Sequence, residues 1–342
     1  MAAASRIEWM DVLRGTSIVL VVFNHAILFT NAATGSPPAA WALNELFAPI
    51  RMPLMVLLSG LLVAPSLARG TKRYVVGKVR RVLYPYLVWS ALALVLLALW
   101  GLRDGLVGGA DPVGDPVASE WWTPLQVLFS PVEHLWFLYD LFLFYLIALG
   151  VRWISPMWIA VVALAAAALI PDFEVRRFFF LLVFFMLGVW FSQRPGLLDR
   201  VLARVWVFWL SAAVALGIVV AVALGGGIRY QAISVPVVAA GIVLATVAAK
   251  RIGGAPALRP LRFVGRDSLV FYLVHWWPTS AGVALGSLSG NGWVAILAGF
   301  VAGLAASTAV AWSIRLWPPI NWLFTAPEPR VVPVESRARD SL

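Results

Sequence analysis

Long apolar stretches recur along this 342-residue chain and constrain its fold more than any other feature. We expect about ten of them to be membrane crossings, since a crossing helix needs about 20 apolar residues. They span 12–31, 43–64, 82–100, 134–150, 154–170, 178–192, 203–224, 232–249, 268–286 and 292–313. Hydrophobic residues make up 62% of the chain and charged residues 12%, against about 45–50% and about 25% in soluble domains. The sequence therefore predicts an all-α, polytopic membrane helix bundle.

Basic residues are distributed unevenly between alternate loops. They cluster in the segments 69–81, 194–204, 250–266 and 315–339, whereas the intervening loops hold Arg103, Arg176, Arg177 and Arg229. Because cytoplasmic loops carry an excess of Lys and Arg, we expect an even number of crossings with both termini cytoplasmic. We place the protein in the plasma membrane. These loops also explain the net charge of +10, so no nucleic-acid partner is expected.

The chain divides into two predicted regions. Residues 1–316 are expected to form one integral-membrane domain. Residues 317–342 are rich in Pro and charge, which predicts a disordered cytoplasmic tail. The longest outer loop, about 101–133, is acidic and could face a sugar.

Several kinds of chemistry lack a sequence signal. The chain has no cysteine, which excludes disulfides, thiolate metal sites and Cys nucleophiles. It has no HExxH, GxSxG, P-loop or clustered metal carboxylates. We therefore expect no metal, and find no support for a serine triad, metal-assisted hydrolysis or ATP-driven transport.

The first apolar stretch carries unusual polar residues. Arg14 and His25 are eleven positions apart, which in a helix is three turns plus about 20°, so both lie on one face about 16 Å apart along the axis. Ionisable residues are costly inside a membrane and mark functional sites. Alternatively, Arg14 snorkels to the cytoplasmic interface and His25 lies near the outer one. The stretch by itself leaves both interpretations open.

The chain has three histidines, each in or at the end of an expected crossing. Histidine suits proton transfer near neutral pH. His134 opens the fourth crossing at the outer interface, and His275 lies one to two turns inside the ninth. A single membrane histidine is usually a hydrogen-bonded packing residue, which we favour for His134 by itself. For His25, which shares a face with Arg14, we favour function.

Arg51 is another ionisable residue within a crossing, about 12 Å into the second apolar stretch. It needs a carboxylate, a carbonyl or an anionic ligand. Glu45 is in the same helix but nearer the outside. Pro53 frees a backbone carbonyl one turn earlier, which creates a polar spot.

The segment 69–81 holds six cations in thirteen residues. Topology and attraction to anionic lipids would suffice to explain it. A phosphate site for a multiply charged, nucleotide-like cofactor is the functional interpretation. Lys78 and Arg81 are three positions apart and share a face where a helix begins.

Four stretches together resemble the acyltransferase 3 family, integral-membrane O-acyltransferases that modify cell-surface glycans and small exported molecules. Asp11-x-Leu13-Arg14-Gly15, followed by His25, resembles the family's Arg-x10-His signature. The stretch 52–60 is similar to its proline–serine–glycine second helix, 78–86 to its basic Arg-x-x-Arg element, and 134–138 with 272–275 to its fourth- and ninth-helix motifs. Lys78 stands where the family usually has Arg, which keeps the charge but loses the bidentate fork.

The resemblance implies transfer of an acyl group, most often acetyl, from cytoplasmic acyl-CoA to a hydroxyl on the outer side (O-acetylation). The acceptor would be a cell-surface glycan or an exported small molecule. Lys78, Arg80 and Arg81 would hold the CoA phosphates, and Arg14 would position the thioester. His25 would act as general base or transiently carry the acyl group. Asp11, one turn before Arg14, is the expected partner of that guanidinium. Arg51, His134 and His275 are further pocket candidates.

Two other functions are compatible with the same residues. A transporter or exporter of a polysaccharide or metabolite could use Arg14, His25 and Arg51 as a proton or anion relay. Against it, the two halves of the chain show no internal repeat. A non-catalytic partner in polysaccharide assembly is the second alternative.

Overall fold

The structure is a computed structural model of the chain and describes residues 8–107, 131–223 and 230–328. Every regular element within these ranges is helical, which confirms the all-α class. The longer helices are α1 (Glu8–Thr34), α2 (Pro38–Gly60), α5 (Tyr84–Val107), α7 (Trp136–Gly150), α8 (Pro156–Leu169), α9 (Phe173–Ser192), α11 (Val205–Ala223), α12 (Val235–Ile252), α15 (Trp276–Ser287) and α16 (Gly292–Leu316). The shorter ones are α3 (Val63–Leu67), α4 (Thr71–Lys78), α10 (Leu197–Leu202), α13 (Arg259–Arg266) and α14 (Ser268–Val274), with a π-helix η1 (Val79–Leu83) and 3-10 turns η2 (Glu133–Leu135), η3 (Ala232–Ser234), η4 (Pro256–Leu258) and η5 (Pro318–Leu323).

Seven helical stretches in the described part of the chain are long and apolar enough to cross a membrane. They are Glu8–Thr34, Pro38–Leu67, Thr71–Leu96, Glu133–Gly150, Phe173–Ser192, Ala232–Ile252 and Gly292–Leu316. The other three expected crossings correspond to α8, α11 and the α14–α15 pair, of which α8 and α11 are shorter apolar helices. The chain is therefore a multi-pass membrane protein, whereas the count of about ten and the cytoplasmic termini stay predictions.

The expected ninth crossing, 268–286, differs from the prediction. We expected one helix with His275 inside it, but the regular helix is interrupted at His275, between α14 and α15. Pro278 explains the interruption, since it lacks the N–H that would bond to the carbonyl of Val274. The backbone N–H of Thr279 resumes the pattern by donating to the carbonyl of His275 at 2.9 Å.

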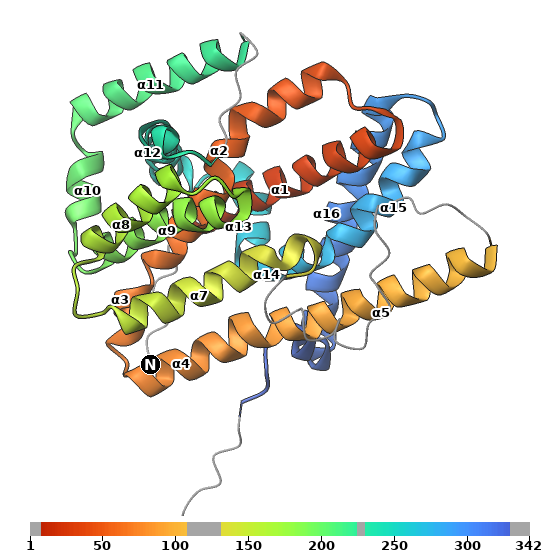
Figure 1. Cartoon of the computed structure of the whole chain (residues 1–342), viewed down its shortest axis with the longest axis horizontal. Coiled ribbons are helices and arrows are strands. Elements are labelled where there is room, and N and C mark those ends of the chain that lie inside the picture. The colour runs from red at the N-terminus through yellow and green to blue at the C-terminus, as the bar shows by residue number, and fades with distance from the viewer. Residues whose placement is uncertain (1–7, 108–130, 224–229, 329–342) are drawn as a thin grey trace, which may run out of the picture.

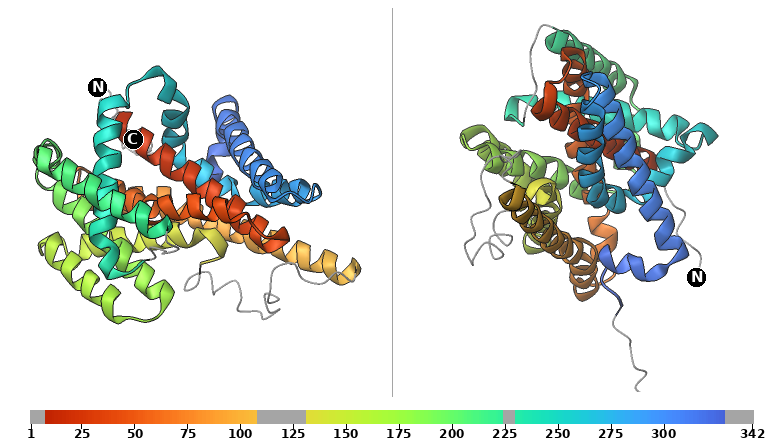
Figure 2. Two further views of the ribbon diagram at one scale, coloured as in Figure 1. Left: turned by 90° about the horizontal axis from the view of Figure 1, so that it is seen from above. Right: turned by 90° about the vertical axis from the view of Figure 1, so that its right-hand side faces the viewer.

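Helix α1 passes through the middle of the bundle (Figure 1), in contact with α2, α12, α13, α15 and α16. Figure 2 shows α15 and α16 paired on one side of α1, with α8 and α9 on the other. About half of the most apolar window of α1 is buried inside the protein. A helix in this position can present functional side chains to several neighbours at once.

Two glycine pairs allow helices to approach at backbone distance. Gly60 of α2 faces α9, where a Cβ would overlap the carbonyl oxygen of Phe185, and Gly188 of α9 faces Leu57 in the same way. Gly15 of α1 and Gly265 of α13 form a second such pair. Gly60, the glycine of the serine–glycine motif in the second helix, thus allows α2 to pack closely on α9.

Residues 317–328 correct the prediction of a disordered tail. They include the 3-10 turn η5, and Phe324 is buried against Trp89, with ring centroids 5.6 Å apart. The indole of Trp89 also donates to the carbonyl of Leu323 at 3.0 Å. The aromatic rings therefore anchor the segment on α5. The rest of the expected tail, 329–342, and most of the acidic loop, 108–130, lie outside the described residues.

Contacts between distant segments gather the basic loops at one end of the bundle, which we call the basic end. Hydrogen bonds join residue 64 to 192 and residue 80 to 326. A salt bridge joins 199 to 250, and the Lys250 ammonium lies over the ring of Trp9. The segments 69–81, 194–204 and 250–266 therefore lie at this end, together with the start of α1. The opposite end holds the turns 34–38, 131–135, 230–235 and 288–292. The two ends differ in charge, as the loop pattern predicts.

Candidate active site

The three histidines meet in one cluster, although they come from α1, from η2 and from the α14–α15 junction. The rings of His25 and His275 are stacked, with centroids 5.1 Å apart, and His134 lies edge-on to His275 at 5.4 Å. Trp276 stacks on His134 at 4.7 Å and touches His25 edge-on at 4.8 Å. The structure thus unites His25 with the two histidines that we considered as pocket candidates.

Hydrogen bonds fix the orientation of two of these rings. Nδ1 of His275 lies 2.9 Å from the carbonyl oxygen of Phe271, and its Nε2 lies 2.9 Å from Nδ1 of His25. Because a carbonyl only accepts, a neutral His275 carries its proton on Nδ1 and accepts at Nε2. Nδ1 of His25 must then donate, which leaves Nε2 of His25 as an unprotonated nitrogen. The pair is arranged as a base with a defined lone pair.

The interrupted helix positions His275 for this role. Its backbone N–H donates to the carbonyl of Phe271 at 3.2 Å, and the same carbonyl lies next to the ring. The side chain is fully buried, whereas that of His25 is only partly buried. His275 therefore supports His25 from inside the protein.

His134 has a different environment. Its backbone carbonyl accepts the hydroxyl of Tyr272, and its buried ring packs on Trp276. Neither ring nitrogen has a hydrogen-bond partner among the described residues. The preceding residue, Glu133, has φ of 46°, a left-handed conformation that is strained for a non-glycine residue. The buried, stacked ring is in line with the packing part of the role that we favoured for His134, whereas the hydrogen bond expected with that role is not found among the described residues.

Arg14 and Asp11 lie near the start of α1, at the basic end. Because α1 is unbroken from Glu8 to Thr34, Arg14 and His25 share one helical face about 16 Å apart. Asp11 is buried and Arg14 is partly buried, where α13 packs closely through Gly265. The expected pairing of Asp11 with Arg14 stays a prediction.

The predicted phosphate-binding cations lie on α4 and η1. Residues 79–83 form a π-helix, in which the N–H of Tyr84 bonds to the carbonyl of Val79. Pro85 favours this wider turn, because it offers no N–H to the carbonyl of Arg81. The Lys78 ammonium lies 3.6 Å from the ring centroid of Tyr145, and Arg81 is exposed.

Arg80 differs from its expected role. Its Nε and Nη2 donate to the carbonyl of Ala326 at 3.0 and 2.7 Å, and its Nη1 pairs with the carboxylate of Glu328 at 3.0 Å. We expected Arg80 to hold CoA phosphates, but here its donors bind the segment 317–328. Of the three predicted cations, Arg81 is the one most open to a ligand.

Arg51 bridges α1 and α2 through two asparagines. Its Nη1 donates to Oδ1 of Asn44 and its Nη2 to Oδ1 of Asn24, both at 2.8 Å. Sequence reasoning missed both partners as site residues. The available signal was Asn24, a polar residue next to His25 in an apolar stretch. All three residues line a cavity of about 270 Å³ near the opposite end from the basic loops.

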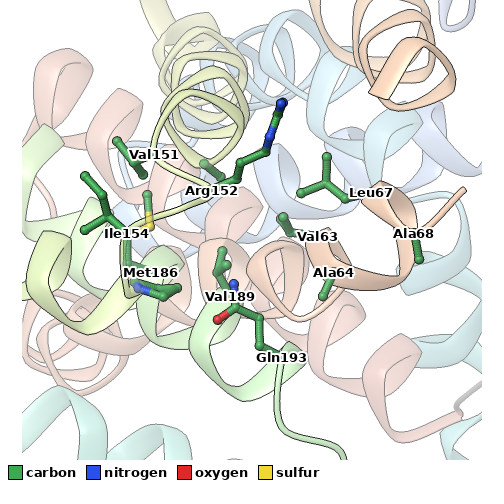
Figure 3. Close-up of a pocket in the computed structure, with 12 residues that line it drawn as sticks. Val63, Ala64, Leu67, Ala68, Val151, Arg152, Ile154, Met186, Val189 and Gln193 are labelled. Carbon is green, nitrogen blue, oxygen red and sulfur yellow. The ribbon is translucent and has the colours of Figure 1, made fainter. Parts of the chain in front are cut away.

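A second cavity, of about 260 Å³, lies at the basic end (Figure 3). Its walls come from α3, from the end of α9 and from residues 151–154 after α7. Arg152 and Gln193 are its polar lining residues, and the others are apolar. None of the predicted site residues lines this cavity.

A family model described as an acyltransferase domain matches residues 7–314, nearly the whole chain and every predicted site residue. No match was found among curated proteins or among solved structures. The match agrees with the resemblance carried by Arg14, His25 and the later motifs. The chain belongs to the acyltransferase 3 family.

Proposed function

We propose that this membrane acyltransferase moves an acyl group, acetyl being the expected one, from cytoplasmic acyl-CoA to a hydroxyl on the opposite side. The hydroxyl belongs to a cell-surface glycan or an exported small molecule. The observation that carries the proposal is the hydrogen bond between His25 and His275, which leaves Nε2 of His25 as a base. Acyl transfer to a hydroxyl needs such a base.

The proposed reaction uses the chain's residues in order. Nε2 of His25 takes the proton of the acceptor hydroxyl while its oxygen attacks the thioester carbonyl. The tetrahedral intermediate then collapses, the carbon–sulfur bond breaks, and the thiolate of CoA leaves. Protonated His25 returns its proton to that sulfur, so the products are the ester and free CoA. General-base catalysis of this kind contributes about 10²–10⁴-fold in rate.

The donor is proposed to enter from the basic end. Arg81 is exposed there and Lys78 lies beside it, so both can meet phosphate groups. Arg14 lies on α1 between this end and His25, where a cation can orient the thioester. Membership of an acyltransferase family does not favour the alternative of a transporter with an Arg and His relay.

The test compares histidine variants in membranes supplied with radiolabelled acetyl-CoA. We expect His25→Ala to lower incorporation of label into surface glycans and exported molecules by about 10²–10⁴-fold, with unchanged membrane insertion. We expect His275→Leu to give a similar loss, because Nδ1 of His25 then loses its acceptor. His275→Gln offers an oxygen to that nitrogen and should recover part of the rate.

Membrane insertion of each variant is the control, measured as the amount of full-length protein in the membrane fraction. Wild-type incorporation of label by His25→Ala would refute the proposed base. Equal rates for His275→Leu and His275→Gln would show that His275 does not act through the hydrogen bond.

A further inference from the structure

The cavity beside Arg51 has no role in the reaction described so far. Four helical regions and one turn build it, with Asn24 and Leu28 from α1 on one face and Trp41, Asn44 and Arg51 from α2 opposite. Phe173 and Phe180 of α9, Tyr230 from the turn before α12, and Val238 of α12 close the remaining walls. Its volume of about 270 Å³ is enough for part of a sugar-sized ligand. Asn24 directly precedes His25, so the cavity reaches the turn of α1 that carries His25, although His25 is not one of its lining residues.

The side chains that accept hydrogen bonds from the Arg51 guanidinium are neutral. A guanidinium cannot accept a hydrogen bond, so the atoms of Asn24 and Asn44 that face it are their carbonyl oxygens. No carboxylate forms an ion pair with Arg51 among the residues that the structure describes. Two of its five N–H donors are used by the asparagines, and in the described part of the chain no hydrogen bond uses the other three. A partly buried cation of this kind favours an anionic partner.

The other polar groups of the cavity are also mainly donors. One lone pair of each amide oxygen is used by Arg51, and the NH₂ groups of Asn24 and Asn44 are the amide donors that a ligand can meet. Burial raises the pKa of the Tyr230 hydroxyl, so this side chain stays protonated and can donate. Glu45 is the carboxylate of the lining, and it forms no ion pair with Arg51. A donor-rich lining matches a ligand that is rich in acceptors.

We propose that this cavity recognises the acceptor through an oxyanion, either a carboxylate or a phosphate, bound by Arg51. The proposal rests on the proposed function, because it names the substrate class of the same reaction. It makes the preferred acceptor an acidic glycan or exported molecule rather than a neutral one. Trp41, Phe173 and Phe180 of the lining provide aromatic rings, and the apolar face of the acceptor's sugar ring packs against them.

The test measures binding to the purified full-length chain in detergent, without acyl-CoA. Methyl β-glucuronide and methyl β-glucoside differ by a carboxylate, and glucose 6-phosphate supplies a phosphate instead. We expect the glucuronide or the phosphate, but not the glucoside, to raise the thermal unfolding temperature, followed by tryptophan fluorescence. The anion that raises the unfolding temperature more shows whether the oxyanion of the acceptor is a carboxylate or a phosphate. Equal shifts with all three sugars, or no shift with any, would overturn the proposal.

Two variants that change the charge of the cavity in opposite directions make the test specific for Arg51. Asn44→Asp gives Arg51 a carboxylate of its own with almost no change of shape, so the affinity for the anion should fall about tenfold or more. Glu45→Gln removes the negative charge from the same cavity, so that affinity should rise. Anion binding that is unchanged in Asn44→Asp, or weakened in Glu45→Gln, would contradict the role of Arg51.

The design separates this proposal from the proposed function. Anion binding is read from unfolding temperature, whereas acyl transfer is read from label incorporation. If transfer depends on His25 but none of the anions binds, only the acceptor class is wrong. If anions bind as expected but His25→Ala transfers label at the wild-type rate, only the proposed base is wrong.

Discussion

At the scale of single residues, Arg80 and Arg81 are neighbours with different tasks. The donors of Arg80 bind Ala326 and Glu328, whereas Arg81 is exposed. We expect Arg81→Ala to raise the KM for acetyl-CoA about tenfold, because one charge-assisted contact to a phosphate is lost, with an unchanged unfolding temperature. We expect Arg80→Ala to lower the unfolding temperature, because residues 317–328 lose their anchor. Donor titrations and thermal unfolding of both variants measure these effects.

Lys72→Ala is the matched control for that comparison. Lys72 is an exposed cation of the same basic segment, seven residues before η1. Its loss reports on the general attraction of the basic end for an anionic donor. If Lys72→Ala raises the KM as much as Arg81→Ala does, the rise comes from the loss of net positive charge, and Arg81 makes no specific contact with the donor.

The sequence predicts some of these residues and not their partners. Arg14 and His25 are predictable because a helical period relates them over a short distance. The contact between His25 and His275 joins residues 250 positions apart, and only the packing of α14 and α15 on α1 brings it about. Arg80 is one of several neighbouring cations in the sequence, so its contacts with Ala326 and Glu328 could not be predicted from charge.

At the scale of helices, the packing of α2 on α9 depends on Gly60. A methyl group there would overlap the carbonyl oxygen of Phe185. We expect Gly60→Ala to destabilise the protein by about 1–3 kcal/mol, since overpacking has costs of that order. Gly77→Ala in α4 is the control: nothing lies within 4 Å of the added Cβ, and alanine favours a helix over glycine by about 0.5–1 kcal/mol.

Thermal unfolding in detergent compares the two alanine variants. The expected order of unfolding temperatures is Gly77→Ala at or above the wild type, and Gly60→Ala below it. If Gly60→Ala unfolds at the wild-type temperature, the close approach of α2 and α9 does not contribute to stability.

Most helices were predictable from apolar length alone, because membrane thickness fixes the length of a crossing. The interruption at His275 was not predicted, although Pro278 was a signal for it in the expected span. The π-helix η1 likewise precedes Pro85. Proline marks where a helix is irregular, but the surrounding packing decides whether it kinks, widens or breaks.

At the scale of the whole molecule, the two ends of the bundle differ in charge. The bias of basic loops predicts this division, because it depends on composition rather than on packing. Which helices are neighbours was not predictable, since every crossing offers a similar apolar surface. The structure adds that the histidine cluster is held by α1, which contacts both the α15–α16 pair and α2.

The sidedness of the bundle can be tested because the chain has no cysteine of its own. Single cysteines at exposed positions then report on one place each. Ala68→Cys and Ala203→Cys lie at the basic end, and Ala33→Cys and Ser289→Cys lie at the opposite end. Since basic loops stay in the cytoplasm, we expect a membrane-impermeant maleimide to label the second pair in intact cells, and the first pair only after permeabilisation. Labelling of Ala68→Cys in intact cells would show that the orientation is the reverse of the expected one. The predicted CoA-binding cations would then lie on the side that lacks the donor.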